Sequence, residues 1–300
     1  MRAVRFHQYG DPQVLTLEDA PEPHAEPGQV RIRVRAASVN PIDWKIRAGY
    51  LAEMMPTTFP AVPGSDAAGV VDEVGDGTTG VTVGDEVFGL AVSGSASDLA
   101  VLGAWAPVPS TWSVEQAAAA GLVSTTAIAG LDALGDLAGR TILLEGAAGG
   151  VGSAAVEIAV ARGAIVIGTA SERHHDFLRS LGATPVTYGE GLAARVAAVA
   201  PGGVDVALDL AGSGSLADLV AIVGDPAKVA TVADFGAAAL GVTIVQGAAN
   251  APANLALAAE LGTAGSYTPR IDTTYPLRQA AEAHAYVQAG HAQGKVVLTV

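Results

Sequence analysis

The chain contains no cysteine among its 300 residues. This absence excludes disulfide bonds, zinc sites built on thiolates and cysteine nucleophiles. Charge is also scarce, because only 15% of the residues are charged, and acidic residues outnumber basic ones by 30 to 16, which gives a formal net charge of −14. A surface of this sign repels nucleic-acid phosphates and anionic lipids, so we expect no nucleic-acid partner and no membrane partner.

Long hydrophobic runs are missing as well. No uncharged apolar segment reaches the roughly 18 residues that a membrane helix needs. The first residues lead into a polar strand pattern rather than the apolar core of a signal peptide, and we therefore expect a cytoplasmic protein. Half of the residues are nevertheless hydrophobic and 37 are glycine, which is typical of an ordered globular protein with one or two buried cores.

The first third of the chain has the two-residue period of β-strands. In residues 30–36, apolar side chains alternate with three arginines, which predicts a strand with one buried face and one wet face. Further short strands are predicted at residues 69–74 and 86–90, separated by turns rich in glycine and aspartate. Many short strands joined by such turns favour a compact β-rich domain.

The pattern changes near residue 114, where an alanine-rich helix is predicted to run to residue 134. Apolar strands then alternate with helices, which favours a parallel sheet covered on both faces. The predicted strands span residues 141–145, 164–168, 204–210, 228–233 and 242–246, and the predicted helices span residues 153–162 and 171–181. We expect the strand at 242–246 to form the sheet's edge. The tail has a predicted helix (276–289) and a last strand (295–300) that lacks an obvious sheet.

A glycine-rich segment, GAAGGVG at residues 146–152, lies between a predicted strand and a predicted helix. Read from Ala147, it fits the dinucleotide-binding fingerprint with alanine in the first glycine position. Small residues there let the chain turn sharply and approach a pyrophosphate, which the N–H groups of the helix N-terminus can bind. We therefore predict a dinucleotide site formed by Ala147, Ala148, Gly149, Gly150, Val151 and Gly152.

The end of the next predicted strand indicates which dinucleotide is bound. An NAD site usually has a carboxylate there for the ribose 2′-hydroxyl. This chain instead offers the hydroxyl of Ser171 and the guanidinium of Arg173, which suit a 2′-phosphate. In the alternative interpretation, Ser171 only caps the following helix and Arg173 is a solvated charge, and Glu172 between them weakens the phosphate interpretation. We expect NADPH as the cofactor.

Four separated segments, in this order, resemble the quinone oxidoreductase (zeta-crystallin-like) branch of the medium-chain dehydrogenase/reductase superfamily. They are GQVRIRVRAASVNPIDWKIRAG at residues 28–49, PGSDAAGVV and VGDEVFG within 59–89, GAAGGVG at 146–152 and GKVVLTV at 294–300. The resemblance implies an α/β fold in which a Rossmann doubly wound parallel-sheet domain (123–249) is inserted into a GroES-like β-rich catalytic domain (1–122 and 250–300). It also implies a homodimer formed through the edge strand of the Rossmann sheet.

The resemblance further implies chemistry without a metal. Zinc-dependent relatives carry a His-Glu pair where this chain has Ser65-Asp66, together with cysteine ligands that this chain lacks. We therefore expect an enzyme that passes hydride from NADPH to a small-molecule quinone or α,β-unsaturated carbonyl. The alternatives are a dedicated enoyl or iminium reductase or a non-redox cyclase of specialised metabolism, and an NADPH-binding protein with a structural or regulatory role.

By the same resemblance, Asn40, Tyr50 and Thr126 would lie near the nicotinamide and the substrate as catalytic residues. Each has a structural alternative. Asn40 precedes Pro41 and could be a helix N-cap, Tyr50 could be an exposed or cleft-wall aromatic, and Thr126 could be a helix-interior hydroxyl bonded back to the backbone.

Two further aromatic residues are assigned to the cofactor site by the resemblance. Tyr188 matches a family tyrosine that flanks the adenosine phosphate. Phe235 would line the nicotinamide end, with a core aromatic as the alternative. His174 and His175 lie near the expected 2′-phosphate, and we favour solvated residues for both.

Overall fold

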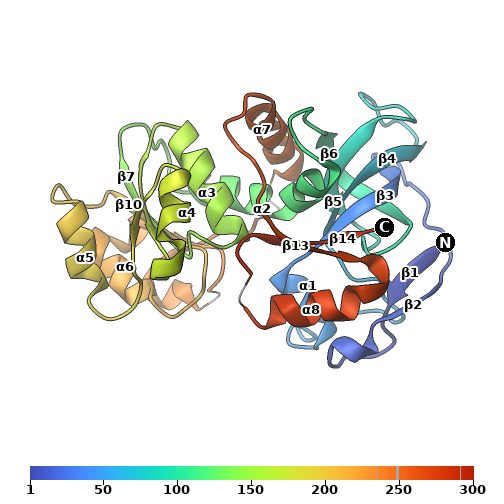
Figure 1. Cartoon of the computed structure of the whole chain (residues 1–300), viewed down its shortest axis with the longest axis horizontal. Coiled ribbons are helices and arrows are strands. Elements are labelled where there is room, and N and C mark those ends of the chain that lie inside the picture. The colour runs from blue at the N-terminus through green and yellow to red at the C-terminus, as the bar shows by residue number, and fades with distance from the viewer. Residues whose placement is uncertain (235, 248–249, 291) are drawn as a thin grey trace. The chain divides into compact units, whose positions relative to one another are not determined.

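The computed structural model describes residues 1–234, 236–247, 250–290 and 292–300 (Figure 1). The chain separates into two compact units. Unit 1 comprises Met1–Leu122, Leu255–Thr263 and Pro269–Val300, and unit 2 comprises Val123–Asn254 and Ala264–Thr268. The first boundary falls where the predicted domains meet. The second falls five residues later than predicted, and a short stretch after it returns to unit 2.

Unit 1 is built on a six-stranded sheet in the order β13-β14-β3-β4-β5-β6. Its strands are β3 (Val30–Val39), β4 (Asp66–Val74), β5 (Glu86–Ala91), β6 (Leu99–Pro107), β13 (Ile271–Pro276) and β14 (Lys295–Thr299). Strand β3 also pairs with β6, so the pairings from β3 to β6 close into a ring. A separate antiparallel pair is formed by β1 (Arg2–Arg5) and β2 (Thr16–Asp19).

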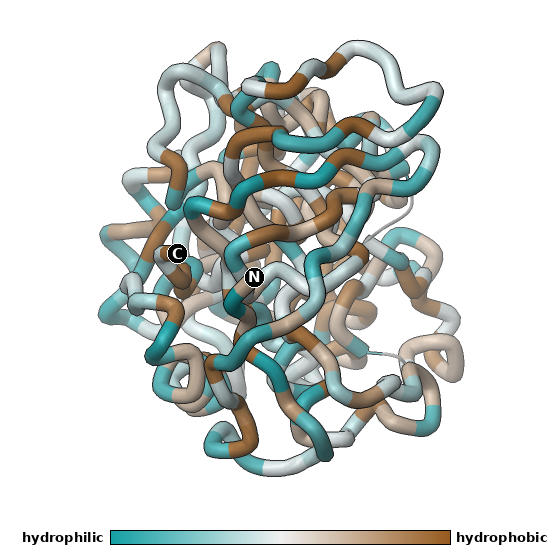
Figure 2. Tube along the Cα trace, turned by 90° about the vertical axis from the view of Figure 1, so that its right-hand side faces the viewer, coloured by the Kyte–Doolittle hydropathy of each residue, from teal (hydrophilic) through white to brown (hydrophobic). Residues whose placement is uncertain are grey.

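The alternating pattern of residues 30–36 produces the predicted two-faced strand. Val30 and Ile32 in β3 are fully buried, whereas Arg31 reaches the other face and donates to Asp72 at 2.9 Å. Figure 2 shows this alternation as teal and brown segments along neighbouring strands. One face therefore fills the core while the other carries ion pairs.

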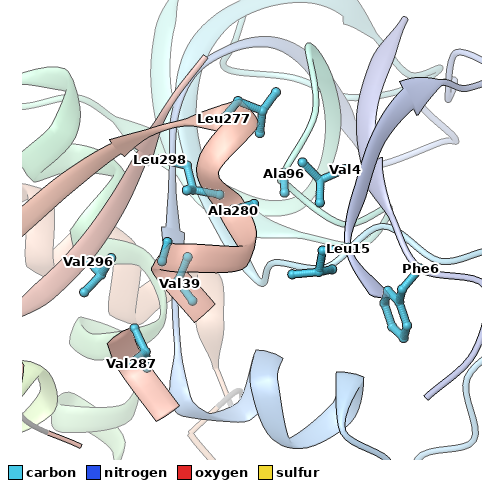
Figure 3. Close-up of a cluster of buried hydrophobic side chains, with 11 residues drawn as sticks. Val4, Phe6, Leu15, Val39, Ala96, Leu277, Ala280, Val287, Val296 and Leu298 are labelled. Atoms are coloured by element: carbon cyan, nitrogen blue, oxygen red, sulfur yellow. The ribbon is translucent and has the colours of Figure 1, made fainter. Parts of the chain in front are cut away.

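The C-terminal strand finds its sheet beside the N-terminal part of the chain. Strand β14 pairs antiparallel with β3, with Val296 opposite Val39, and the red and blue ribbons run together in Figure 1. A buried cluster (Figure 3) joins Val4 and Leu298 to helix α8 (Ala280–Gln288). Residues from both ends of the chain thus share one core.

The predicted helix at 276–289 begins later than expected. Residues up to Pro276 belong to β13, because that residue pairs with Thr299 at the end of β14. The helix α8 starts only after the short 3₁₀ turn η5 (Leu277–Gln279). Sheet pairing therefore replaces the first helical turn that the local sequence favours.

Unit 2 contains a parallel sheet in the order β12-β11-β10-β7-β8-β9. This is the doubly wound order with its switch point between β7 and β10, and it confirms the predicted Rossmann fold. The strands are β7 (Thr141–Glu145), β8 (Ile165–Thr169), β9 (Thr184–Val186), β10 (Val206–Asp209), β11 (Val229–Thr231) and β12 (Thr243–Ile244). The helices of this segment are α3 (Gly150–Ala161), α4 (His175–Ser180), α5 (Leu192–Val199) and α6 (Leu216–Val223).

Several elements of unit 2 differ from their predicted extents. Strand β12 lies at the sheet's edge as expected, but it has only two residues. Helix α3 begins three residues earlier than predicted, and the helix expected at 171–181 is divided into η2 (Glu172–His174) and α4.

The remaining helices and 3₁₀ turns of the described residues are η1 (Pro12–Val14), α1 (Pro41–Arg47), α2 (Val114–Asp132), η3 (Pro226–Lys228), η4 (Ala237–Leu240) and α7 (Ala251–Thr263). In the described part of the chain, no helix has the length and hydropathy required to span a bilayer.

Candidate functional site

Four strands of the unit 2 sheet end in a buried polar residue. These residues are Glu145 on β7, Thr169 on β8, Asp209 on β10 and Thr231 on β11, and none is more than 3% exposed. Because neighbouring strands are parallel, their carboxyl ends share one edge of the sheet. Open α/β sheets bind ligands outside this edge, at the switch point between strands such as β7 and β10.

The buried row holds the loops that leave the sheet. The Thr169 hydroxyl accepts a hydrogen bond from the Gly146 N–H at 3.1 Å. One carboxylate oxygen of Asp209 accepts from the Ala211 and Gly212 N–H groups, each at 2.9 Å. The backbone after β7 and β10 is therefore anchored by side chains of the sheet itself.

Glu145, the last residue of β7, binds the loop after β10 across the switch point. Ser213 donates to one carboxylate oxygen at 2.6 Å, and Ser215 donates to the other. The neighbouring Asp209 is held in turn by the Thr231 hydroxyl at 2.7 Å. The sequence interpretation included none of these residues, because a polar residue at a strand end carries no local signal of which distant loop it will bind.

The glycine-rich turn after β7 has the predicted strand–turn–helix context. Its left-handed residue is Gly146, with a φ of 75°, one position before the fingerprint as we read it. Ala147 is fully buried and its N–H donates to the Thr169 carbonyl at 3.1 Å, so this residue holds the turn against the end of β8. A side chain on Gly152 would overlap the Gly146 carbonyl oxygen, which explains why helix α3 needs glycine there.

The other residues of the predicted fingerprint lie at the start of α3. Gly149 occupies the N-cap position, where it has no side chain to cover the helix end, and the helix begins at Gly150. Ala148 and Val151 flank this point and are half-buried. The first N–H groups of a helix have no acceptor within the helix, so this turn can offer them to an anionic ligand.

The segment after β8 contains the predicted 2′-phosphate residues. Ser171 occupies the N-cap position of η2, but its side chain makes no capping hydrogen bond, which argues against the structural alternative. Arg173 is exposed, and its Nε donates to the His174 ring at 3.0 Å. Our preference for solvated histidines is wrong for His175, which is half-buried and whose Nε2 is buried without a partner among the described residues.

The remaining predicted residues of unit 2 are placed as follows. Tyr188 lies just after β9 and is 56% exposed. Thr126 is half-buried in α2, with the Gly247 backbone packed against it. Phe235 lies outside the described residues.

In unit 1, Asn40 lies in a buried polar network at the start of α1. It is 1% exposed and occupies the N-cap position, where its backbone N–H donates to Asp43 at 2.7 Å. Its side-chain nitrogen donates to Asp66 at 2.9 Å, and its side-chain oxygen accepts from Lys295. These contacts engage the whole side-chain amide with buried neighbours, so Asn40 is held at the start of α1 by the polar network.

The same network buries two carboxylates beside one ammonium group. Burial raises the pKa of Asp43 to about 6, although the Ser65 hydroxyl donates to it at 2.6 Å. Burial likewise lowers the pKa of Lys295, against the attraction of Asp66 and Asp43. Asp66 also accepts from the Leu122 N–H at 2.8 Å. Sequence reasoning missed Lys295, because it is 255 positions from Asn40.

These residues do not fit a zinc ion. Asp66, which stands where zinc-dependent relatives have a ligand pair, is committed to Ser38, Asn40 and the α2 backbone. Over the described residues there is no group of three or more histidine, aspartate or glutamate side chains that could hold a metal.

Tyr50 follows α1 and is the most exposed of the predicted catalytic residues. Its side chain is 71% exposed, and its ring meets Trp44 edge-on with 5.7 Å between centroids. The phenol is thus supported on one side by an aromatic contact and remains accessible.

Comparison with known proteins covers nearly the whole chain. The family model for the alcohol dehydrogenase GroES-like domain matches residues 26–132, and the model for zinc-binding dehydrogenases matches residues 181–298. The chain is 31% identical to a quinone oxidoreductase of Rattus norvegicus, over 99% of this chain and 97% of that protein. It is 32% identical to a 2-methylene-furan-3-one reductase of Solanum lycopersicum, over 99% of this chain and 79% of the relative.

A solved structure shows the same similarity in three dimensions. A mycobacterial protein complexed with NADPH superposes with a TM-score of 0.86 at 27% identity, over 100% of both chains.

Proposed function

Because the chain belongs to the quinone oxidoreductase branch of the medium-chain dehydrogenase/reductase superfamily, and is therefore an oxidoreductase, we propose that it passes hydride from NADPH to a quinone or an α,β-unsaturated carbonyl without zinc. The observation that carries this proposal is the edge of the unit 2 sheet. There the small-residue turn at 146–152 opens α3, and the strand next to it ends in Thr169 rather than in a carboxylate, with Ser171 and Arg173 following on either side of Glu172.

The cofactor site follows from these groups. The nicotinamide of bound NADPH supplies the hydride. The free N–H groups at the start of α3, together with its helix dipole, bind the pyrophosphate, and Gly149 adds no side chain in their way. Ser171, Arg173 and Tyr188 receive the 2′-phosphate through hydroxyl and guanidinium donors, which a carboxylate there would oppose.

The proposed class of hydride acceptor follows from residues that do not fit a zinc ion, because the chain has no thiolate and Asp66 is committed to hydrogen bonds. Quinones and enones already draw electrons, so the protein has to orient the acceptor and stabilise negative charge on its oxygen. Tyr50 is the proposed donor to that oxygen, since its phenol is accessible, and Thr126 is the proposed contact to the nicotinamide. We now assign Asn40 a positioning role at the start of α1, because its amide is already engaged by Asp43, Asp66 and Lys295.

Two of the similar proteins support the proposed acceptor and the proposed cofactor. One is named as a reductase of a methylene furanone, which is an activated alkene, and a structural neighbour was solved with NADPH. The relative named for a methylene furanone also makes a dedicated biosynthetic reductase the second candidate. A homodimer paired through the β12 edge and a cytoplasmic location complete the proposal.

The test is NADPH oxidation by the purified full-length chain. We would follow absorbance with 1,4-benzoquinone, 9,10-phenanthrenequinone, a 2-alkenal and a cyclic enone, each repeated with NADH and with EDTA. The proposal expects turnover that prefers NADPH and survives EDTA. Loss of activity in EDTA contradicts the zinc-free mechanism, and tight NADPH binding without reduction of any acceptor contradicts the acceptor class.

A further inference from the structure

One guanidinium holds the loop that follows β9. Arg195, in the first turn of α5, donates to the carbonyl oxygens of four consecutive residues, and we call this arrangement the carbonyl clamp. Its contacts are Nε to Thr187 at 2.8 Å, Nη1 to Glu190 at 2.8 Å, and Nη2 to Tyr188 at 3.2 Å and Gly189 at 3.0 Å.

The clamp follows from helix geometry. Side chains in a helix lean toward its N-terminus, so Arg195 reaches back over the first turn of α5. Gly191, with a φ of 77°, makes the left-handed bend before the helix, and a Cβ there would lie 3.1 Å from Arg195 Nη1. Because the four carbonyls point inward to the guanidinium, the loop presents side chains such as Tyr188 outward, where it is 56% exposed.

Helix stability does not explain this arginine. A cation in the first turn opposes the helix dipole, and α5 has neither a side-chain N-cap bond nor an acidic residue there. Among the residues that the structure describes, no carboxylate lies within ion-pair distance of Arg195. Its charge is therefore shared with carbonyl dipoles and is not neutralised.

The clamped loop lies next to the segment that carries Ser171 and Arg173. Strands β8 and β9 are parallel with Thr169 opposite Val186, and the Ala170 N–H donates to the Val186 carbonyl at 3.0 Å. The chain segments that follow the two strands therefore leave the same edge of the sheet as neighbours.

We propose that Arg195 is a positioning residue that sets the preference for NADPH over NADH. By holding residues 187–190, it keeps Tyr188 at the border of the 2′-phosphate site. This inference rests on the proposed function, since it requires a dinucleotide at this edge.

The experiment measures dissociation constants of the full-length chain for NADPH, NADH and adenosine 2′,5′-bisphosphate by calorimetry. Arg195→Met removes the clamp and is expected to weaken NADPH and the bisphosphate by about tenfold, with NADH changed by less than about twofold. Arg195→Lys keeps the charge but has no planar fork to span four carbonyls, so it should lose most of the preference as well. Arg179→Met is the matched control, since it removes the same charge from an exposed position on α4.

The outcomes separate the two proposals. A wild-type protein that binds NADH as tightly as NADPH contradicts the proposed cofactor, whatever the variants do. If the wild type prefers NADPH and Arg195→Met keeps that preference, the role of Arg195 is overturned. A wild-type preference in Arg195→Lys, or an equal loss in Arg179→Met, also overturns it, because charge alone would then be responsible. Should Arg195→Met fail to fold by circular dichroism, Arg195→Lys decides between the same two results.

Discussion

His284 makes the stability of unit 1 sensitive to acid. It lies on α8 with 1% of its surface exposed, and its Nδ1 has no partner among the described residues. Burial, with a further contribution from the nearby Arg47 guanidinium, lowers the pKa of this histidine to about 3 from 6.5. Between pH 3 and pH 6.5 the imidazole of His284 is therefore protonated in the unfolded chain and neutral in the folded chain. The contribution of His284 to the free energy of unfolding therefore falls as the pH falls from 6.5 toward 3.

The size of this effect can be worked out. At pH 5 the unfolded imidazole is mostly protonated and the folded one is neutral, which costs about 2 kcal/mol of stability relative to pH 7.5. Asp43 acts in the opposite direction, because its pKa is raised from 3.8 to about 6 and its folded carboxyl takes up a proton first as the pH falls. The wild-type curve contains both contributions, so the histidine must be isolated by substitution.

The assay compares urea unfolding at pH 7.5 and pH 5.0 for wild type and His284→Leu. All three tryptophans (Trp44, Trp105 and Trp112) belong to unit 1, so their fluorescence reports the unit that contains His284. Between the two pH values, the variant should lose about 2 kcal/mol less than wild type. His24→Gln, at a histidine whose side chain is 76% exposed, is the control. Equal losses in wild type and His284→Leu would refute the reasoning.

Three further substitutions test other parts of the structure. Lys295→Met should lower the unfolding free energy of unit 1 by about 3–5 kcal/mol, because it leaves two buried carboxylates without their cation. Tryptophan fluorescence measures this, and the exposed Lys228→Met should change little. Gly152→Ala should weaken NADPH binding at least about tenfold in calorimetry, since its Cβ meets the turn backbone; Gly202→Ala, in open space, should bind normally. Tyr50→Phe should reduce turnover roughly 100-fold without changing the Kd for NADPH if the phenol donates to the product, and a wild-type rate would exclude that role.

Much of unit 2 could be predicted from local sequence. Five of the six strands of the parallel sheet overlap predicted apolar runs bounded by turn residues, and the predicted strand at 141–145 has the observed bounds. Strand β9, with the sequence Thr-Pro-Val, was not among the predicted strands. The glycine-rich segment was identifiable because its small residues follow that strand directly. The left-handed Gly146 was missed, since several small residues in a row can make the turn and only the backbone shows which of them does.

Other features depended on partners far along the chain. The short β12 and the late start of α8 reflect strand pairing, which local periodicity does not contain. Asn40 shows the same limit for a functional residue. Its sequence context supported both a cap and a catalytic contact, and the choice depends on Asp66 and Lys295, which approach it only in the folded unit.

The amino-acid sequence by itself determined the two-part α/β architecture, the dinucleotide turn and the lack of thiolate ligands. Those properties reside in residue types and in spacings of a few positions, which hydrophobic periodicity and turn chemistry reveal. Only the tertiary structure decided which polar groups became buried together, as in the Lys295 network and the row of strand ends beginning with Glu145. The same holds for the carbonyl clamp of Arg195. Desolvation, pKa shifts and hydrogen bonding depend on distances in space, and the chain acquires those distances only when it folds.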